Sequence, residues 1–600
     1  MTTFKARWTL LGVAVFAAAN VVSAARAKDE LPKAVRNVLS EESQISRSDW
    51  NRRQQLGDEL GRAKSDAEKL RWHAGYVETA DGWKPVEELG SPKSQNDRLA
   101  TYLQKRQTVS RNSEDQWKLA SWCLSNDLRD RGEAHLFQSV LLAPAGADTS
   151  EQLKRLRYRM AGQKLVSPVE YAELEREAEI RDRDHNQWLS RVSRIVASVR
   201  VDAKNQPVPP SRTNEIEHNA AVPAIEHALT SANEAQSKVL VDVLGRTRSY
   251  RAAQTLARLA ILSPSLAIRD AAIEALRTRK KDDFVPDLIG LLKTPVEHKV
   301  ETAVGPRGEQ YSRFVWAQED ATTIQLIDFR LFDRTTASRW TYVTSFRNPE
   351  IRGIHYIPNQ PADIAKLHQI RKSVIDLDAL ADRANDQTVE TNERVSSVLG
   401  VVCDSPNRST PQDWWSWWAE YEDVEPSPKR TVIVKEENQQ VGRIVPPTMR
   451  ISCLVSGTPI WTEHGLMPID QVQIGDRVLS KNVETGELAL KPVLHTTYRP
   501  PRKTTRFVLG DDSIQATGGH RFWVSGSGWT RTRELAADQP MHTTTGTTRI
   551  TAVEIAEESS TYNLVVADFH TYFVGKSGIL SHDVLPPKPT NKVVPGLSDD

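Results

Sequence analysis

Apolar residues recur at helical spacing along the first two thirds of the chain, and this pattern predicts a largely α-helical upstream region. From residue 28 to about residue 205 the chain is rich in charge. Apolar faces at residues 117–128 and 134–143 predict two helices joined by a short polar step. A proline-rich stretch at residues 207–210 marks a break. We therefore expect one helical region over 28–205 and a second over 206–425.

Leucines in the second region repeat at an offset of 32 residues, with one set at Leu244, Leu256 and Leu259 and the next at Leu276, Leu288 and Leu291. Together with the alanine-rich phrase at residues 268–276, this spacing resembles HEAT repeats. The helix pair at 117–143 resembles a degenerate tetratricopeptide (TPR) unit. Such units bury their apolar faces only against their neighbours, so we expect an α-solenoid. A plain helical bundle is the alternative that the periodicity leaves open.

Two segments interrupt this helical pattern. Residues 323–330 alternate in polarity and are rich in β-formers, which predicts a small β insertion near 310–335. A helix that begins after Thr410 carries four tryptophans within residues 414–418. These tryptophans favour a helix that closes the end of the array, and a platform that binds sugar or peptide is the alternative.

The stretch from Cys453 to Asp583 carries an ordered set of motifs, at residues 451–460, 465–469, 474–479, 517–520, 562–566, 570–574 and 578–583. In this order they resemble the pretoxin-type Hint (hedgehog/intein) domain of bacterial polymorphic toxins, which is related to inteins. The resemblance covers about 130 of the 600 residues. It implies an all-β Hint domain over 451–583. A proline-rich step at 425–430 predicts a linker at 426–450, and a proline-rich, polar run predicts a disordered tail at 584–600.

The resemblance implies an intein-like reaction at the Ser452–Cys453 bond. The Cys453 thiol would attack the carbonyl of Ser452 and convert the amide to a thioester. A free thiol has a pKa of about 8.5, so it needs a nearby base or a lowered pKa to form thiolate. By the same resemblance, His520 would contact the scissile amide and Thr517 would help to orient it. Cys453 is the only cysteine in this segment.

The far end of the segment departs from the intein pattern. His570 matches a second family histidine, and His582 matches the penultimate histidine that assists cleavage there. Asp583 stands where inteins place the asparagine that cyclises, and a carboxylate is a much weaker internal nucleophile than a carboxamide. Val584 offers no hydroxyl or thiol to accept an acyl group, so we do not expect full splicing. Asn563 replaces an aspartate common in inteins, although pretoxin-type relatives commonly read Tyr-Asn-Leu.

Composition and the first residues indicate the compartment. Lys5 and Arg7, an apolar run at 10–22 and small residues up to Ala27 predict a signal peptide over 1–27. We therefore expect a secreted, periplasmic or cell-surface protein with no transmembrane segment beyond the signal peptide. Three cysteines exclude a disulfide framework, and neither a metal nor another cofactor is expected. A net charge of +1 gives no global attraction to nucleic acid.

These observations predict an exported autoprocessing protein that cleaves itself once at Ser452–Cys453 rather than a turnover enzyme. Water would hydrolyse the thioester, or a surface nucleophile would accept the acyl group, so that the helical-repeat part is released or transferred. Two other classes of function stay open. One is a non-enzymatic scaffold whose helical repeats bind a protein partner beside an inactive Hint domain. The other is carbohydrate or peptidoglycan recognition by the tryptophan-rich helix.

Overall fold

The computed structural model describes the chain over residues 67–79, 82–90, 97–144, 148–161, 164–202, 207–304, 310–321, 323–333, 340–344, 352–356, 361–405, 408–423, 431–436, 439–440, 452–592 and 594–596. The predicted signal peptide and most of the predicted linker lie outside these residues. The chain forms two compact units, which we describe separately. The first consists of Met1–Gln187, Ala419–Glu425 and Ile444–Asp600, and the second of Trp188–Trp418 and Pro426–Arg443.

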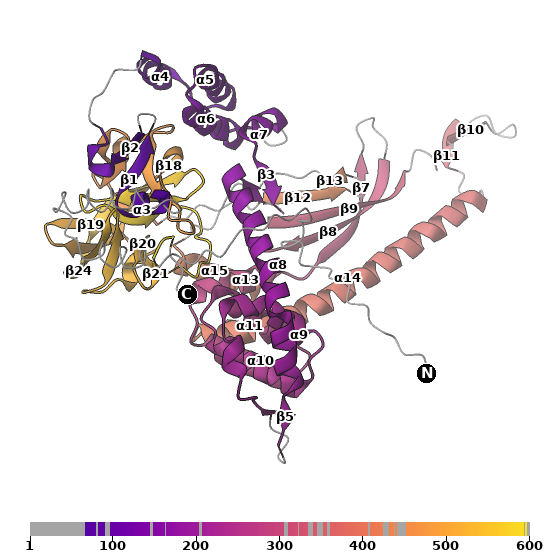
Figure 1. Cartoon of the computed structure of the whole chain (residues 1–600). Coiled ribbons are helices and arrows are strands. Elements are labelled where there is room, and N and C mark those ends of the chain that lie inside the picture. The colour runs from indigo at the N-terminus through magenta and orange to yellow at the C-terminus, as the bar shows by residue number, and fades with distance from the viewer. Residues whose placement is uncertain are drawn as a thin grey trace. The chain divides into compact units, whose positions relative to one another are not determined.

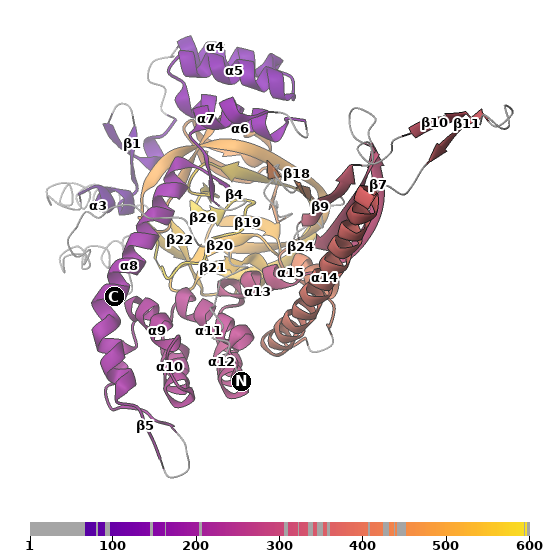
Figure 2. The same ribbon diagram turned by 90° about the vertical axis from the view of Figure 1, so that its right-hand side faces the viewer.

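Short helices in the second unit lie side by side after the long helix α8 (Pro168–Ala197), whose C-terminal part belongs to this unit (Figure 2). They are α9 (Val222–Leu229), α10 (Glu234–Arg246), α11 (Tyr250–Leu262), α12 (Leu266–Leu276) and α13 (Val285–Leu291). Side-chain caps set the starts of α10, α11 and α12, as in the capping box of Asn233 and Gln236 at α10, whereas α9 and α13 have a proline in their first turn.

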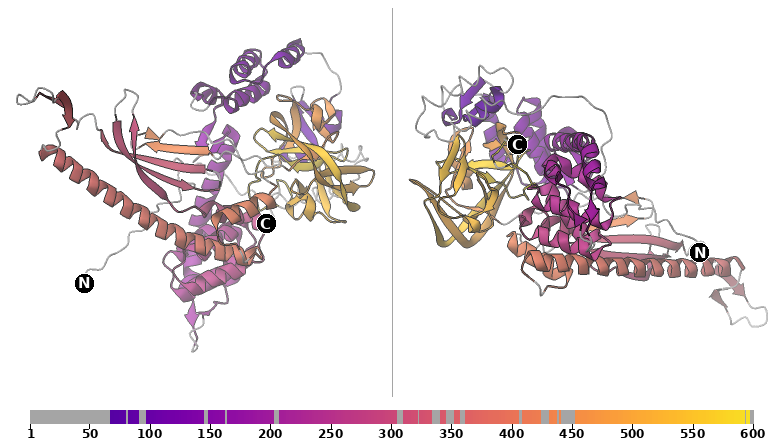
Figure 3. Two further views of the ribbon diagram at one scale, coloured as in Figure 1. Left: turned by 180° about the vertical axis from the view of Figure 1, so that it is seen from behind. Right: turned by 60° about the horizontal axis from the view of Figure 1, so that its bottom comes forward.

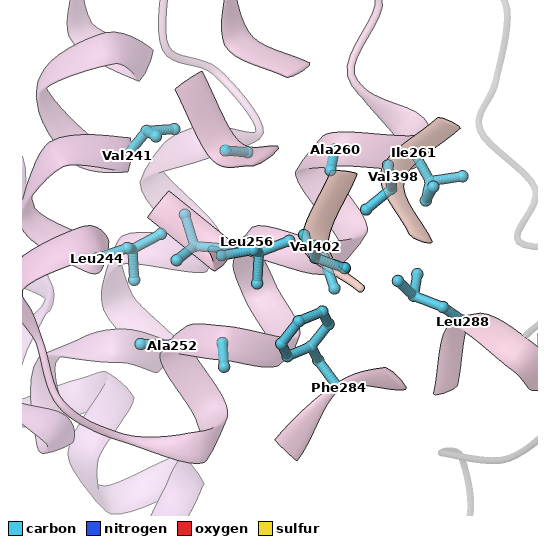
Figure 4. Close-up of a cluster of buried hydrophobic side chains, with 14 of the residues drawn as sticks. Val241, Leu244, Ala252, Leu256, Ala260, Ile261, Phe284, Leu288, Val398 and Val402 are labelled. Atoms are coloured by element: carbon cyan, nitrogen blue, oxygen red, sulfur yellow. The ribbon is translucent and has the colours of Figure 1, made fainter. Parts of the chain in front are cut away.

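The leucines of the predicted repeat supply much of the core of this unit. Leu244, Leu256, Leu276 and Leu288 are buried there, and Figure 4 shows Leu244, Leu256 and Leu288 with Phe284 and Val402. Leu291 is 39% exposed, so the second repeat is less regular than the first. Burial of these leucines explains why apolar residues recur at this spacing. That the repeats are of the HEAT family stays a prediction.

A five-stranded sheet occupies the place of the predicted β insertion and is larger than expected. Its order is β13-β12-β9-β8-β7, and the strands are β7 (Glu297–Val304), β8 (Gln310–Glu319), β9 (Thr323–Asp333), β12 (Thr431–Glu436) and β13 (Gln439–Gln440). Strands β12 and β9 run parallel. The long helix α14 (Pro361–Val402) lies beside this sheet (Figure 3), and Asn385 and Asn392 on it hydrogen-bond the backbone of Val296 and Lys293. A separate hairpin joins β10 (Trp340–Thr344) and β11 (Arg352–Tyr356).

The tryptophan-rich helix is α15 (Pro411–Tyr421). Thr410 and Asp413 exchange hydrogen bonds as a capping box, which confirms the predicted start. Trp414 and Trp415 are buried in the helical core, so they close the array, as the sequence favoured.

The first unit contains a sheet of thirteen strands formed by the C-terminal residues (Figure 1). Its strands are β14 (Leu454–Val455), β15 (Pro459–Thr462), β16 (Gly465–Pro468), β17 (Arg477–Lys481), β18 (Leu488–Leu509), β19 (Asp512–Thr517), β20 (Arg521–Val524), β21 (Gly528–Arg531), β22 (Pro540–Thr543), β23 (Gly546–Arg549), β24 (Ala552–Val566), β25 (Thr571–Val574) and β26 (Ile579–His582). The long strands β18 and β24 pair along most of their length, with register shifts that bend them.

Upstream segments also belong to the first unit. They are α3 (Ala67–His73), β1 (Tyr76–Thr79), β2 (Gly82–Pro85), α4 (Asp97–Thr108), α5 (Ser113–Ser125), α6 (Arg129–Leu141), α7 (Ser150–Leu156), β3 (Arg159–Ala161), β4 (Lys164–Val166) and the first part of α8. Helices α5 and α6 are the predicted helix pair. Their turn places Asp127 at a φ of 59°, a left-handed conformation that aspartate tolerates.

The tail after Asp583 differs from its expectation where it is described. Val584 is fully buried, and Gly596 donates a backbone hydrogen bond to Val483 over 2.8 Å. The expectation of disorder therefore does not hold for residues 584–592 and 594–596. None of the helices in the described part of the chain combines the length and apolarity that a membrane span requires.

Candidate active site

The Ser452–Cys453 peptide bond lies at the edge of the short strand β14, which pairs with both β19 and β24. Because Leu454 faces Ala516, Cys453 comes to lie opposite Thr517. The backbone N–H of Cys453 donates to the Thr517 hydroxyl over 2.8 Å, and the Thr517 N–H donates to the Cys453 carbonyl over 2.9 Å. The nitrogen of the scissile bond is therefore fixed by Thr517.

The carbonyl of the same bond is held by Asn563. The side-chain amide of Asn563 donates to the Ser452 carbonyl over 2.7 Å. Its own oxygen accepts from the Tyr572 hydroxyl at 2.8 Å and from the Leu564 N–H at 2.7 Å. These two donors define which end of the amide is oxygen, so the NH₂ group must face Ser452.

His520 lies just after the end of β19 and contacts the Ser452 carbonyl as well. Its ring hydrogen-bonds the backbone of Ser452, and because this bond raises the histidine pKa, the partner is an acceptor. Its Nε2 lies 2.7 Å from the Ser581 hydroxyl. Burial lowers the pKa of His520 to about 4, against the smaller effect of Ser452, so the ring is neutral at pH 7. Thr532 holds the His520 carbonyl through its N–H and hydroxyl, which fixes the loop.

The Cys453 thiol is protonated in this environment. Burial raises the pKa of Cys453 to about 11, while the Thr561 hydroxyl and the Arg499 charge act in the opposite direction. Attack by sulfur therefore requires that a neighbouring group accept its proton.

A second cluster surrounds Asp583 at the far end of the segment. His570 Nδ1 lies 3.0 Å from the Asp583 carboxylate and His570 Nε2 lies 3.2 Å from Glu170. Burial alone would lower the pKa of His570, but the two carboxylates raise it to about 10. Burial would likewise raise the pKa of Glu170, but His570 lowers it to about 2. His570 is therefore a buried cation between two carboxylates.

Asp583 is an immobilised carboxylate. It accepts the N–H of Val566 at 3.1 Å and the N–H of Leu585 at 2.8 Å, in addition to the pair with His570. His582 places Nδ1 3.1 Å from the backbone carbonyl of Asp583, and burial holds the pKa of His582 well below its usual range.

Comparison with known families identifies this part of the chain. Residues 460–584 match the pretoxin HINT domain family. The C-terminal part of the chain is a Hint domain. The matched range begins after Cys453, which joins the Hint sheet through β14. A domain of this intein-like kind gives the chain a general capacity for autoprocessing.

Several solved structures are similar to the Hint domain. A bacterial intein-like domain from Clostridium thermocellum is 31% identical, covers 22% of this chain and is itself covered to 97%, with a TM-score of 0.21. The gp41-1 intein is 20% identical and covers 22% of this chain and 98% of its own, with a TM-score of 0.19. A DnaB intein from Synechocystis sp. PCC 6803 is 16% identical, with the same coverages and a TM-score of 0.21. Among curated proteins none is significantly similar to the chain.

The structure brings the residues that the Hint resemblance pointed to into two groups. Ser452, Cys453, Thr517 and His520 meet at the first bond, and His570, His582 and Asp583 meet at the second. The other two cysteines, Cys123 and Cys403, are buried free thiols. Within the described residues, no group of three or more His, Cys, Asp or Glu side chains is placed to hold a metal ion.

Sequence reasoning missed four contributors to the Hint site: Asn563, Tyr572, Ser581 and Glu170. Asn563 had a signal, because it belongs to the Tyr-Asn-Leu motif, but it was read only as a mild departure from inteins. Glu170 had none, because it lies 400 residues from His570. His495 lies in β18, where Gln138 contacts it over 3.1 Å.

Proposed function

We propose that the chain cleaves itself between Ser452 and Cys453 through an N-to-S acyl shift. The observation that supports this most directly is that one peptide group is held at both ends. Thr517 binds its N–H, while Asn563 and His520 bind its carbonyl oxygen.

The proposed step balances as follows. Cys453 Sγ bonds to the Ser452 carbonyl carbon, and negative charge develops on the carbonyl oxygen, where Asn563 and His520 donate. The bond from that carbon to the Cys453 nitrogen then breaks. The thiol proton moves to this nitrogen, which becomes a free amine. The product is a thioester between Ser452 and the Cys453 sulfur.

His520 is proposed to act as a neutral donor that stabilises the developing oxyanion, because burial lowers its pKa to about 4 and both of its ring nitrogens are engaged, one with Ser452 and Nε2 with the Ser581 hydroxyl. Thr517 keeps the leaving nitrogen in place during the proton transfer. Water, or a surface amine, hydroxyl or thiol, would then take the Ser452 acyl group, so that the upstream part is released or transferred.

We further propose that the protein is exported through the segment at 1–27 and acts outside the cytoplasm, and that the helical repeats bind a protein partner. The positively charged start, apolar run and small residues support export. This part of the proposal is independent of the chemistry at Cys453.

The test is intact-mass measurement of the purified full chain, with and without added dithiothreitol. We expect fragments that end at Ser452 and begin at Cys453. Cys453→Ala should abolish them, whereas Cys403→Ala, which removes a buried thiol of the second unit, should not. Fragments that persist in Cys453→Ala would refute the mechanism.

One observation favours the alternative of a scaffold with an inactive Hint domain. A thiol with a pKa of about 11 is almost entirely protonated at neutral pH. If the wild-type chain stays intact through prolonged thiol treatment at pH 8 to 9, where more thiolate forms, the scaffold function is the better conclusion.

A further inference from the structure

The Hint domain shares a hydrophobic core with a segment that lies far upstream of the scissile bond. Val77 of β1 and Val86 are fully or almost fully buried. They belong to one cluster with six buried residues of the Hint sheet: Trp461, Leu479, Leu488, Trp523, Phe573 and Leu580. Figure 1 shows the indigo strands β1 and β2 against the orange and yellow strands of the sheet. If this segment were removed, these aromatic and aliphatic side chains would be exposed to water.

A second upstream segment, Tyr421 to Asp423, inserts a carboxylate next to the His520 loop. Glu422 accepts from Arg521 at 2.9 and 3.1 Å and also from Arg531. The three side chains are at most 3% exposed. Both arginines belong to the Hint domain, and Arg521 directly follows His520. A buried carboxylate between two guanidinium groups is favourable only while all three stay together.

The neighbouring residues of this segment fit the same surface. The Tyr421 ring lies under the Arg531 guanidinium at 4.3 Å. A Cβ atom on Gly519 would collide with the Asp423 carboxylate, so glycine at position 519 permits this close approach.

A third set of contacts comes from helices α4 and α6. Arg131 pairs with Glu463 at 2.5 Å, and Arg106 pairs with Asp476. Gln138 donates to the Leu494 carbonyl over 2.6 Å. Four of these side chains, those of the two ion pairs, are at most 13% exposed, so water screens the charges weakly.

Each of these contacts joins a residue that precedes the Ser452–Cys453 bond in the sequence to a residue that follows it. We propose that cleavage at this bond leaves a nicked, non-covalent complex in which the fragment that begins at Cys453 stays bound to the fragment that ends at Ser452. This inference rests on the proposed function. It implies that hydrolysis or transfer of the Ser452 acyl group breaks the covalent link, and that release of the helical part then requires a separate dissociation of the two fragments.

The test must measure whether the two fragments stay associated independently of whether the chain cleaves itself. A recognition sequence for a site-specific protease is placed within residues 441–450 of the full chain carrying Cys453→Ala, which cannot form the thioester. After the protease has cut, size-exclusion chromatography and native mass spectrometry should give one species containing both fragments at equal amounts. Denaturing electrophoresis of the same sample should show two bands.

Fragments that elute separately under native conditions would overturn the proposal. If the wild-type chain never cleaves itself but the protease-cut chain stays together, the shared surface is supported and only the proposed function fails. The two failures are therefore distinguishable.

Glu422→Gln tests the contribution of the buried carboxylate. It should raise the dissociation constant of the cut fragments by about tenfold or more, because two buried arginines lose their countercharge. The matched control is Glu420→Gln, two residues away on the exposed side of the same segment, which should leave the dissociation constant unchanged. Circular dichroism of the uncut variants checks that both are folded. An unchanged dissociation constant for Glu422→Gln would show that Glu422 does not contribute to the association of the two fragments.

Discussion

At Asn563 a single side-chain amide faces the oxygen on which charge would develop when Cys453 attacks. Replacing Asn563 with alanine removes this donor, and loss of one such donor typically lowers a rate by about 100- to 1000-fold. We expect the formation of fragments at Ser452–Cys453 to slow by that factor, measured as a time course of intact mass. Tyr572→Phe, which only frees the orientation of the amide, should have a smaller effect.

The control is Tyr498→Phe on the neighbouring strand β18, since Tyr498 is 59% exposed and its register partner is Tyr562, not Asn563. It should cleave at the wild-type rate. An Asn563→Ala chain that cleaves as fast as wild type would show that the amide plays no part in the chemistry.

We propose that the charge of Asp583 limits scission at the second junction. A carboxylate fixed by two backbone N–H groups and by His570 cannot readily attack its own carbonyl carbon. Asp583→Asn places a carboxamide there, and its nitrogen can cyclise. We expect this variant to release residues 584–600 at least about tenfold faster than wild type, detected by mass spectrometry of the small fragment. Absence of this fragment would mean that the surrounding hydrogen bonds, and not the charge, prevent scission.

The residues of the site were predictable only where a motif carried them. Cys453, Thr517 and His520 could be found in the sequence because their spacing matches the Hint pattern. The contact of Asn563 with Ser452 depends on how β24 registers with β14, which no local pattern encodes. The role of Ser581 likewise follows from its pairing opposite Phe522, next to the His520 loop.

At the scale of elements, the start of α8 connects the upstream region to the Hint site. Ser167 and Glu170 form a capping box, in which the Glu170 N–H donates to the Ser167 hydroxyl and the Ser167 N–H donates to Glu170. The second oxygen of Glu170 pairs with His570. The sequence Ser-Pro-Val-Glu therefore predicts a helix start, but nothing in it predicts the partner on the far side of the chain.

This pairing predicts a pH dependence of stability. The pKa of His570 is raised to about 10, so its contribution is complete below its ordinary pKa of 6.5 and is lost as the pH rises towards 10. The pKa of Glu170 is lowered to about 2, so its contribution is present above its ordinary pKa of 4.5 and is lost as the pH falls towards 2. Glu170→Gln should therefore lower the free energy of unfolding most between pH 4.5 and 6.5, by about 2 to 4 kcal/mol.

Urea unfolding of Glu170→Gln against its parent, both in a Cys453→Ala chain, measures this difference. The difference should shrink as the pH approaches 10. Glu175→Gln, at an exposed position of the same helix, serves as the control and should be neutral throughout. A Glu170→Gln effect that stays constant from pH 5 to 10 would contradict the ion pair with His570.

At the scale of the whole molecule, sequence patterns predicted the order of the regions but not their grouping into units. The helical periods and the β insertion were visible because each is encoded by the local spacing of apolar residues, and the C-terminal sheet was implied by the resemblance of its motifs to the Hint family. Residues 67–90 carried no sign of their place in the core of a domain that begins more than 350 residues later. Contacts at such separations depend on complementary surfaces, which a single sequence does not display.

This grouping predicts how a truncated chain behaves. A chain that begins at residue 444 keeps the whole Hint sheet but loses Val77, Val86 and Glu422. It then exposes Trp461 and Trp523 and leaves Arg521 and Arg531 without their carboxylate. We expect it to aggregate or to unfold at a lower temperature than the same residues in the full chain, by at least about 10 °C, because each lost contribution is worth roughly 1 to 3 kcal/mol. Thermal unfolding followed by near-ultraviolet circular dichroism of the tryptophans measures this shift. A truncated chain as stable as the full one would mean that the Hint domain is complete without its upstream segments, and that these segments only cover it.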